Sequence, residues 1–461
     1  MLGVQLAALL DGEVPGVAEA LDLVDGFDDA LVHGLARLDE EQAGRLAALA
    51  GALRDTPLGP AVGEAVEKIT AGSIGEQELA ALAGARTTLL GAVHDARLAR
   101  FDAALGRARD TWEEPPASPP VEGPLGAGRS WLQELAITGW RGVDHDLVSA
   151  ADQAVSALLD EPALRGPAVL LDGLAAELRA SCPVATMDRV PARRWADLWA
   201  RALLLLQPGT SGTRPAGAVS GRLLPLGVDV HEHGTAVQIQ VHGVLEPTDG
   251  SPTRLVRASV AAAKVDTIVG PAVWRLLDGH PVLLKALAEH RSVDLAEVPV
   301  TAGGDLIWQD DRATPGEPAD PFATARLRLS DALAPAVPPL ERHPVRIAEP
   351  VLVEGYTIDG DALTLDGHTL AVDLERLPGC GPLTPELVAA SSTCVGLVRW
   401  EAGRWTLQPL AVQATVKRKT VEAHGGDWAL GPTDPKVAKA EAKAGDAVAV
   451  LRERAGRLLR R

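Results

Sequence analysis

The 461-residue chain is poor in residues that form covalent crosslinks and in recognisable catalytic motifs. Its three cysteines, Cys182, Cys380 and Cys394, are too few for a disulfide framework and lack paired metal spacing, which favours a reducing compartment. The patterns GK[ST], G-x-S-x-G, H-E-x-x-H and C-x-x-C are all absent from the sequence. The sequence therefore supports no named reaction.

Long apolar runs and an excess of basic residues are also missing. No segment reaches the roughly 20 uninterrupted apolar residues that a membrane helix needs. The N-terminal stretch MLGVQLAALLDGEVPG has no basic residue before its apolar run, so it predicts a short helix and not a signal peptide. The net charge of -18 opposes general binding to nucleic acid or anionic lipid. We therefore expect a cytoplasmic protein that binds no membrane and for which nucleic acid is an unfavourable partner.

The composition is that of a folded protein with more than one domain. Hydrophobic residues make up 46% of the chain and charged residues 23%, which excludes global disorder. Proline and glycine concentrate at residues 111–130, and this run predicts a linker because neither residue suits the interior of a helix or strand. Trp112 is the only tryptophan before the run ends, whereas nine tryptophans and the single tyrosine, Tyr356, follow it.

The chain before this linker has the periodicity of helices. Residues 1–110 place apolar residues at three- and four-residue spacing and hold 18 acidic against 9 basic residues, which predicts an acidic helical bundle. Asp39 with Gln42, and Ser73 with Glu76, fit the capping-box pattern at two helix starts.

Residues 131–207 predict a second helical segment, distinguished by its tryptophans. Trp195 and Trp199 lie at helical spacing on one face. This face is either an aromatic binding surface or part of a core, and we prefer the core because large aromatic side chains dominate core burial. The Asp-His-Asp triplet at 144–146 predicts a helix start, with a histidine base or metal ligand as the alternative.

The remaining chain predicts two mainly antiparallel β regions, and the whole is expected to be a multidomain α+β protein. Residues 218–308 alternate apolar and polar side chains and predict an antiparallel meander with a helix. Residues 309–345 are rich in proline and predict a connection. Residues 346–461 predict a β-rich region with Asp-Gly turns at 359–360 and 366–367, closed by a basic C-terminal helix.

Three histidines form the best candidate metal site. His231 and His233 lie on the same face of a predicted strand, and the next strand could bring His242 beside them. Such imidazoles could hold a divalent transition metal, although a solvated sheet face beside a turn is the interpretation we prefer. No cofactor is predicted otherwise.

A basic segment near the C-terminus is the remaining candidate contact surface. Residues 417–461 hold 11 basic and 6 acidic residues. Lys417, Arg418 and Lys419 could contact phosphate or a protein partner. The last helix has one apolar stripe, which could dock on a partner or, as we prefer, on its own chain.

Residues 131–153, WLQELAITGWRGVDHDLVSAADQ, are similar to a stretch of uncharacterised bacterial accessory proteins associated with MoxR-type ATPase and von Willebrand A systems. This resemblance implies an accessory subunit with an AAA-type ATPase partner and transfers no functional residues. We therefore predict a non-enzymatic interaction or scaffolding subunit of a bacterial cytoplasmic assembly. The alternatives are a metal-dependent enzyme or metal-binding protein using the three histidines, and nucleic-acid contact through the basic segment.

Overall fold

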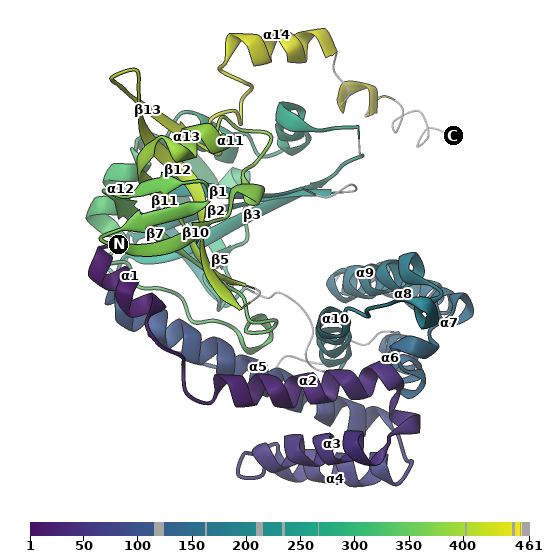
Figure 1. The fold of residues 1–461 in the computed structure, drawn as a ribbon. Helices are drawn as coiled ribbons and strands as arrows, with labels where there is room; N and C mark the ends of the chain where they lie inside the picture. The colour runs from purple at the N-terminus through teal and green to yellow at the C-terminus, as the bar shows by residue number, and fades with distance from the viewer. Residues whose placement is uncertain are drawn as a thin grey trace.

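The computed structural model combines a helical body with two mainly antiparallel sheets, so the chain has the predicted multidomain α+β fold (Figure 1). The structure describes residues 1–114, 124–161, 164–208, 215–232, 236–265, 267–401, 403–444, 448–451 and 453. No helix in these ranges is both long and apolar enough to cross a membrane.

The helical body has one hydrophobic core to which both predicted helical segments contribute. Its helices are α2 (Val17–His33), α3 (Glu40–Ala52), α4 (Gly59–Thr70), the first part of α5 (Glu76–Leu105), α6 (Leu125–Thr138), α7 (His145–Ser149), α8 (Ala151–Leu159), α9 (Arg165–Ser181) and α10 (Ala192–Leu205). Trp195 and Trp199 are almost fully buried, and the indole of Trp199 donates a hydrogen bond to the Leu132 carbonyl. The tryptophan stripe is therefore a core face, as preferred.

The cores do not follow the predicted domain boundaries. Residues from 27 to 85 and from 125 to 206 share the helical core, whereas Leu98 and Phe101, near the end of α5, pack with α1 (Gly3–Leu10) against the second sheet. Helix α6 begins at Leu125, inside the predicted linker, and residues 115–123 lie outside the described ranges. The tryptophan-bearing segment is therefore not an independent domain, because its apolar faces complete the core of the acidic bundle.

The first sheet contains the predicted meander and returns to its own first strand. Its strands are β1 (Gly217–Glu232), β2 (Ala236–Pro247), β3 (Arg254–Ala263), β4 (Arg291–Val300), β5 (Asp305–Leu306) and β6 (Ala313–Pro318), in the order β1-β2-β3-β5-β4-β6, with β1 also pairing with β4. The 3-10 helix η5 (Gly270–Leu277) and α11 (Pro281–Ala288) pack on its core. The helical stretch that follows β3 is therefore divided into two parts, and the second begins at Pro281.

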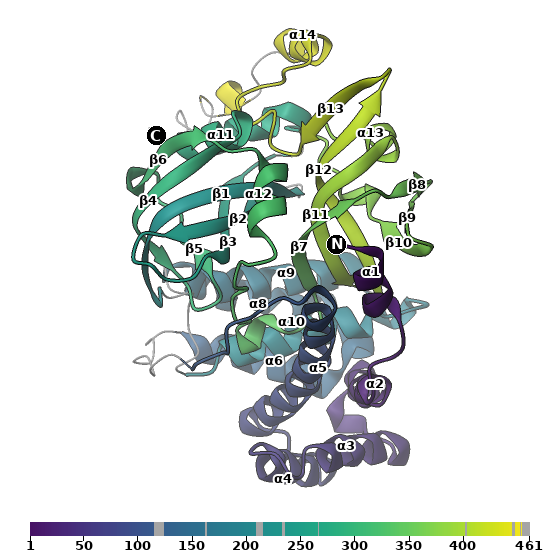
Figure 2. The same ribbon diagram turned by 90° about the vertical axis from the view of Figure 1, so that its left-hand side faces the viewer.

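The second sheet lies beside the first, and α12 (Pro321–Arg328) lies against both (Figure 2). Its strands are β7 (Ile347–Glu354), β8 (Thr357–Asp359), β9 (Ala362–Leu365), β10 (His368–Val372), β11 (Ser391–Glu401), β12 (Arg404–Val416) and β13 (Lys419–His424), in the order β7-β11-β12-β10-β9-β8, with β13 pairing with β12. Helix α13 (Pro385–Ala389) follows β10 in the chain, and α14 (Pro435–Ala444) follows β13. Elsewhere in the described chain, single 3-10 turns lie at Leu35–Arg37, Trp140–Gly142, Val184–Thr186, Asp310–Arg312, Pro339–Glu341 and Leu374–Arg376. Asp366 and Gly367 both have positive φ, as a tight hairpin turn requires.

Two local expectations are wrong. The proline-rich stretch 309–345 is more than a connection, since it contains β6 and α12. Its prolines are tolerated because β6 is an edge strand, where a missing amide leaves no ladder bond unmade. Ser73 does not cap α5, which begins one residue after Gly75 without a side-chain cap.

The two sheets approach each other closely where Gly227 of β1 faces Leu410 of β12. A methyl group on Gly227 would lie 2.6 Å from Leu410 Cβ, so the strands could not keep this spacing. We expect Gly227→Ala to lower the free energy of unfolding by about 1–3 kcal/mol in urea denaturation, the usual effect of overpacking. Gly173→Ala is the matched control, because Gly173 lies in α9 with no atom near its added methyl, and it should be neutral or stabilising. Equal effects of the two changes would contradict the close contact.

Candidate functional sites

The predicted histidine site is not assembled in the described part of the chain. His231 is paired with Gln238 across the β1–β2 ladder, whereas His242 is paired with Gly227. The two histidines are thus four residue pairs apart, about 13 Å along the strands. His233 lies outside the described residues. The register of the ladder therefore separates His231 from His242.

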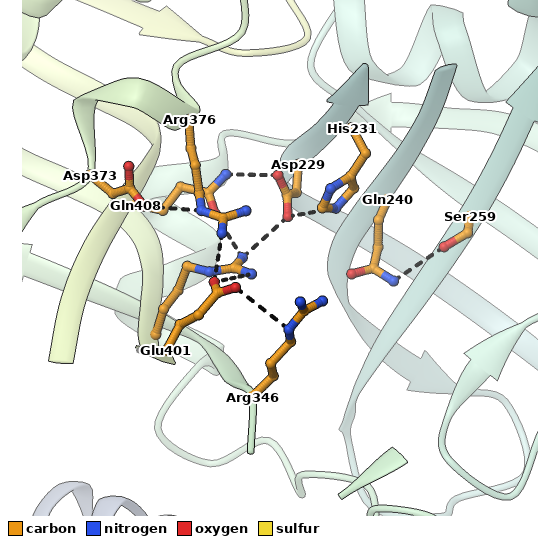
Figure 3. A network of polar contacts seen from close by, with 10 residues as sticks. Asp229, His231, Gln240, Ser259, Arg346, Asp373, Arg376, Glu401 and Gln408 are labelled. Atoms are coloured by element: carbon orange, nitrogen blue, oxygen red, sulfur yellow. Dashed lines mark hydrogen bonds and ion pairs between the residues drawn. The ribbon is translucent and has the colours of Figure 1, made fainter. Parts of the chain in front are cut away.

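His231 instead belongs to a polar network between the two sheets (Figure 3). Its centre is Asp229, whose carboxylate lies 3.0 Å from His231 Nε2 and accepts a 2.7 Å hydrogen bond from the Gln408 amide. Arg399 lies 3.4 Å from the same carboxylate and donates to Gln408 Oε1 at 2.8 Å. Burial acts to raise the pKa of Asp229, but His231, Gln408 and Arg399 outweigh it, and the pKa falls below its ordinary value.

The network continues from Asp229 toward the surface as alternating charges. Glu401 lies 3.8 Å from Arg399, accepts a 2.6 Å hydrogen bond from Arg376 and lies 3.5 Å from Arg346. Arg376 also donates to Asp373 at 3.0 Å. Asp229 lies on β1, Arg399 on β11 and Gln408 on β12, so the contacts of Asp229 with the other two link the first sheet to the second. These contacts thereby position the two sheets.

His242 lines a separate small cavity. Arg109, Arg257 and Glu349 also line this cavity, whose volume is about 50 Å³. His242 is 3% exposed, and its Nε2 has no hydrogen-bond partner among the described residues. Burial and the charge of Arg257 lower the pKa of His242 to about 4. The cavity therefore holds a neutral imidazole and has room for ordered water.

The predicted basic contact residues are brought together on one exposed turn. Lys417 and Arg418 form the turn between β12 and β13, both with positive φ, and Lys419 begins β13. All three side chains are exposed, at the tip of a hairpin that projects from the second sheet (Figure 1). The arrangement can present three positive charges to an acidic surface.

A second cluster of chemically competent side chains was not predicted. It consists of His290, His424 and Asp427, whose candidate ligand atoms all lie within 4.8 Å of one another. Burial and the charge of His290 lower the pKa of His424 to about 4, and the hydrogen bond to Asp427 raises the pKa of His290. The only local signal was the H-x-x-D spacing of residues 424–427, because His290 comes from a distant part of the chain.

Comparison with known proteins gives no further assignment: no family model, curated protein sequence or solved structure matches the chain.

Proposed function

We propose that the chain is a non-enzymatic interaction subunit that holds an acidic helical body and a cationic hairpin in a fixed arrangement. The observation that carries this proposal is the position of α5, a 30-residue helix that contributes side chains to two cores. At 1.5 Å per residue the helix is about 45 Å long. Bending α5 would disturb the packing of the helical core and of the core beside the second sheet. The helix therefore connects the two cores rigidly.

Buried ion pairs reinforce the connection at the end of α5. Arg107 donates to Glu349 at 3.0 Å and to the Pro350 carbonyl at 2.7 Å. Arg109 lies 3.1 Å from the other oxygen of Glu349 and donates to Asp102 at 2.7 Å. These contacts fix the chain that follows α5 on β7 of the second sheet, which supports a scaffold with little relative motion of its parts.

Two surfaces of opposite charge are available for partners. The helical body has exposed acidic side chains on α2, α3 and α4, among them Glu19, Asp22, Asp25, Glu40, Glu41, Glu64 and Glu67. The hairpin presents Lys417, Arg418 and Lys419. Charged surfaces of this kind favour partner selection and fast association more than raw affinity.

The assembly in which the subunit acts is proposed to be bacterial, cytoplasmic and linked to a MoxR-type ATPase with a von Willebrand A partner. Support for this comes from the resemblance of residues 131–153 alone. Trp131 and Trp140 in this stretch are buried in the helical core. We therefore place the partner contacts on the charged surfaces and not on these tryptophans.

The hairpin is tested by quantitative capture from a lysate of the native host, with the full chain as bait. Replacing Lys417, Arg418 and Lys419 with glutamate should lower recovery of a specific protein by about tenfold. A higher salt concentration should lower its recovery by the wild-type chain to a similar extent. The matched control reverses Lys436, Lys439 and Lys443, which are also exposed but lie on α14. Equal recovery by both variants would contradict the proposal. Loss of the captured material on nuclease treatment would favour nucleic-acid contact instead.

A further inference from the structure

We propose that His290, His424 and Asp427 form a binding site for one divalent transition-metal ion of the Zn²⁺ class. Two imidazoles and a carboxylate are ligands that such ions prefer. The site contains none of the three histidines expected from the sequence, and it goes beyond the proposed interaction function.

The central observation is the state of the His424 side chain. His424 is the last residue of β13 and is only 4% exposed. Neither of its ring nitrogens has a hydrogen-bond partner among the described residues. Leaving buried polar atoms without partners costs free energy, and a bound ion would satisfy one of them directly.

The other two ligands lie next to this imidazole. His290 Nε2 is 2.7 Å from Asp427 Oδ1, and the ring centroids of His290 and His424 are 4.1 Å apart. Metal–ligand bonds of about 2.0–2.2 Å place the ligand atoms of a tetrahedral complex about 3.3 Å from one another. The candidate ligand atoms, all within 4.8 Å of one another, therefore lie near the spacing that this geometry requires.

The fold fixes each ligand by backbone contacts. His290 precedes β4 with φ of 47°, a strained conformation for a non-glycine residue, and its carbonyl accepts a 2.7 Å hydrogen bond from Ala319 N–H. Asp427 Oδ2 accepts the backbone N–H of His424 at 3.0 Å. The ring of Phe322 packs edge-on against His424, with centroids 5.3 Å apart. Strain held in this way is common at ligand-binding positions.

The surroundings suit a hydrated cation. The cavity beside the two histidines has a volume of about 20 Å³, which is enough for one water as a fourth ligand but not for an organic substrate. Asp320 and Glu422 add negative potential at His290. Arg291 also lines the cavity, and its guanidinium donates hydrogen bonds to Glu289 and to the Gly316 carbonyl.

The position of the site indicates what the ion would do. His290 comes from the layer of the first sheet. His424 ends β13 of the second sheet, and Asp427 lies in the turn that leads into Trp428 and Ala429, which pack in the core of the first. An ion held by all three residues would bind the two sheets together at this corner. The expected role is structural, with one ion per chain.

The test is calorimetric titration of the chelator-treated full chain with Zn²⁺. We expect one ion per chain, a raised thermal midpoint and, with Co²⁺, the visible absorption of a tetrahedral complex. His424→Gln and Asp427→Asn should each weaken binding by more than about 100-fold, since loss of an outer-shell partner alone costs 10- to 100-fold. His290→Gln, at a half-buried position, provides a further test should the buried variants fold poorly.

The matched control is the double variant His231→Ala, His242→Ala, which should keep the ion and its affinity. Circular dichroism would establish that each variant is folded. Absence of stoichiometric binding to the wild-type chain would overturn the proposal. Retention of the ion by folded His424→Gln, or its loss from the control variant, would overturn it as well.

Discussion

Replacing Arg86 with methionine is expected to lower the free energy of unfolding by about 3–5 kcal/mol. Arg86 lies on α5, is completely buried, and donates to both oxygens of Asp28 on α2, at 2.6 and 3.0 Å. It also donates to Asp197 on α10 at 2.7 Å. One guanidinium thus connects three helices that enclose the helical core.

The large loss of stability in Arg86→Met comes from the Asp28 carboxylate, which stays buried without its main partner. Asp28 is 2% exposed, and burial already raises its pKa despite the presence of Arg86. Without the guanidinium its charge would be buried and only partly compensated by Arg193, so unfolding or protonation would be favoured. Methionine keeps much of the side-chain volume, which separates this electrostatic effect from that of a cavity.

Urea denaturation followed by circular dichroism would measure the change. The matched control is Arg45→Met, which removes exposed ion pairs with Glu41 and Asp29 and should change the free energy of unfolding far less than Arg86→Met does. Adding Asp28→Asn to Arg86→Met should recover part of the loss, because the uncompensated charge is then gone. A wild-type midpoint for Arg86→Met would show that the buried pair contributes no net stability.

The predictions of caps and turns that the structure confirms depend on residues close together in the sequence. Asp39 and Gln42 form the expected capping box at the start of α3. The Asp-Gly pair at 366–367 makes the expected hairpin turn. In each case the side chains that determine the local conformation lie within four residues of one another, so the pattern is visible in the sequence.

The features that sequence reasoning missed depend on contacts between distant segments. Nothing near Arg86 indicates that Asp28 and Asp197 will surround it. In the same way, β6 forms at a proline-rich stretch because β4 offers a free edge. The candidate metal ligand His290 meets His424 only after both sheets have formed, and the predicted pairing of His231 with His242 failed on strand register, which alternation alone does not specify.

Acidification from pH 7.5 to pH 5 is expected to lower the stability of the chain by about 2 kcal/mol for each of two buried histidines. Burial is the main cause that lowers the pKa of both His242 and His343 to about 4, from an ordinary value near 6.5. Between pH 6.5 and pH 4 the unfolded chain therefore binds more protons at these sites than the folded chain. The stability that these two neutral histidines allow is complete above about pH 6.5, the ordinary histidine pKa. It falls as the pH drops toward about 4, the pKa of the two side chains in the folded chain.

His343 is the position at which this effect can be isolated. It is completely buried, neither ring nitrogen has a partner among the described residues, and the charges of Arg201 and Arg86 add to burial in lowering its pKa. His343→Leu removes the titrating group and leaves a side chain of similar size. We expect it to match or exceed the wild type at pH 7.5 and to lose about 2 kcal/mol less than the wild type at pH 5.

The comparison requires urea denaturation of both proteins at several pH values between 7.5 and 5, in the presence of a chelator. His33→Leu is the control, because the His33 side chain is half exposed on α2 and keeps its contact with water on folding. Parallel pH profiles for the wild type and His343→Leu would show that His343 takes up its proton as readily in the folded chain as in the unfolded one. Since its pKa is lowered mainly by burial, such a result would also mean that water reaches this side chain.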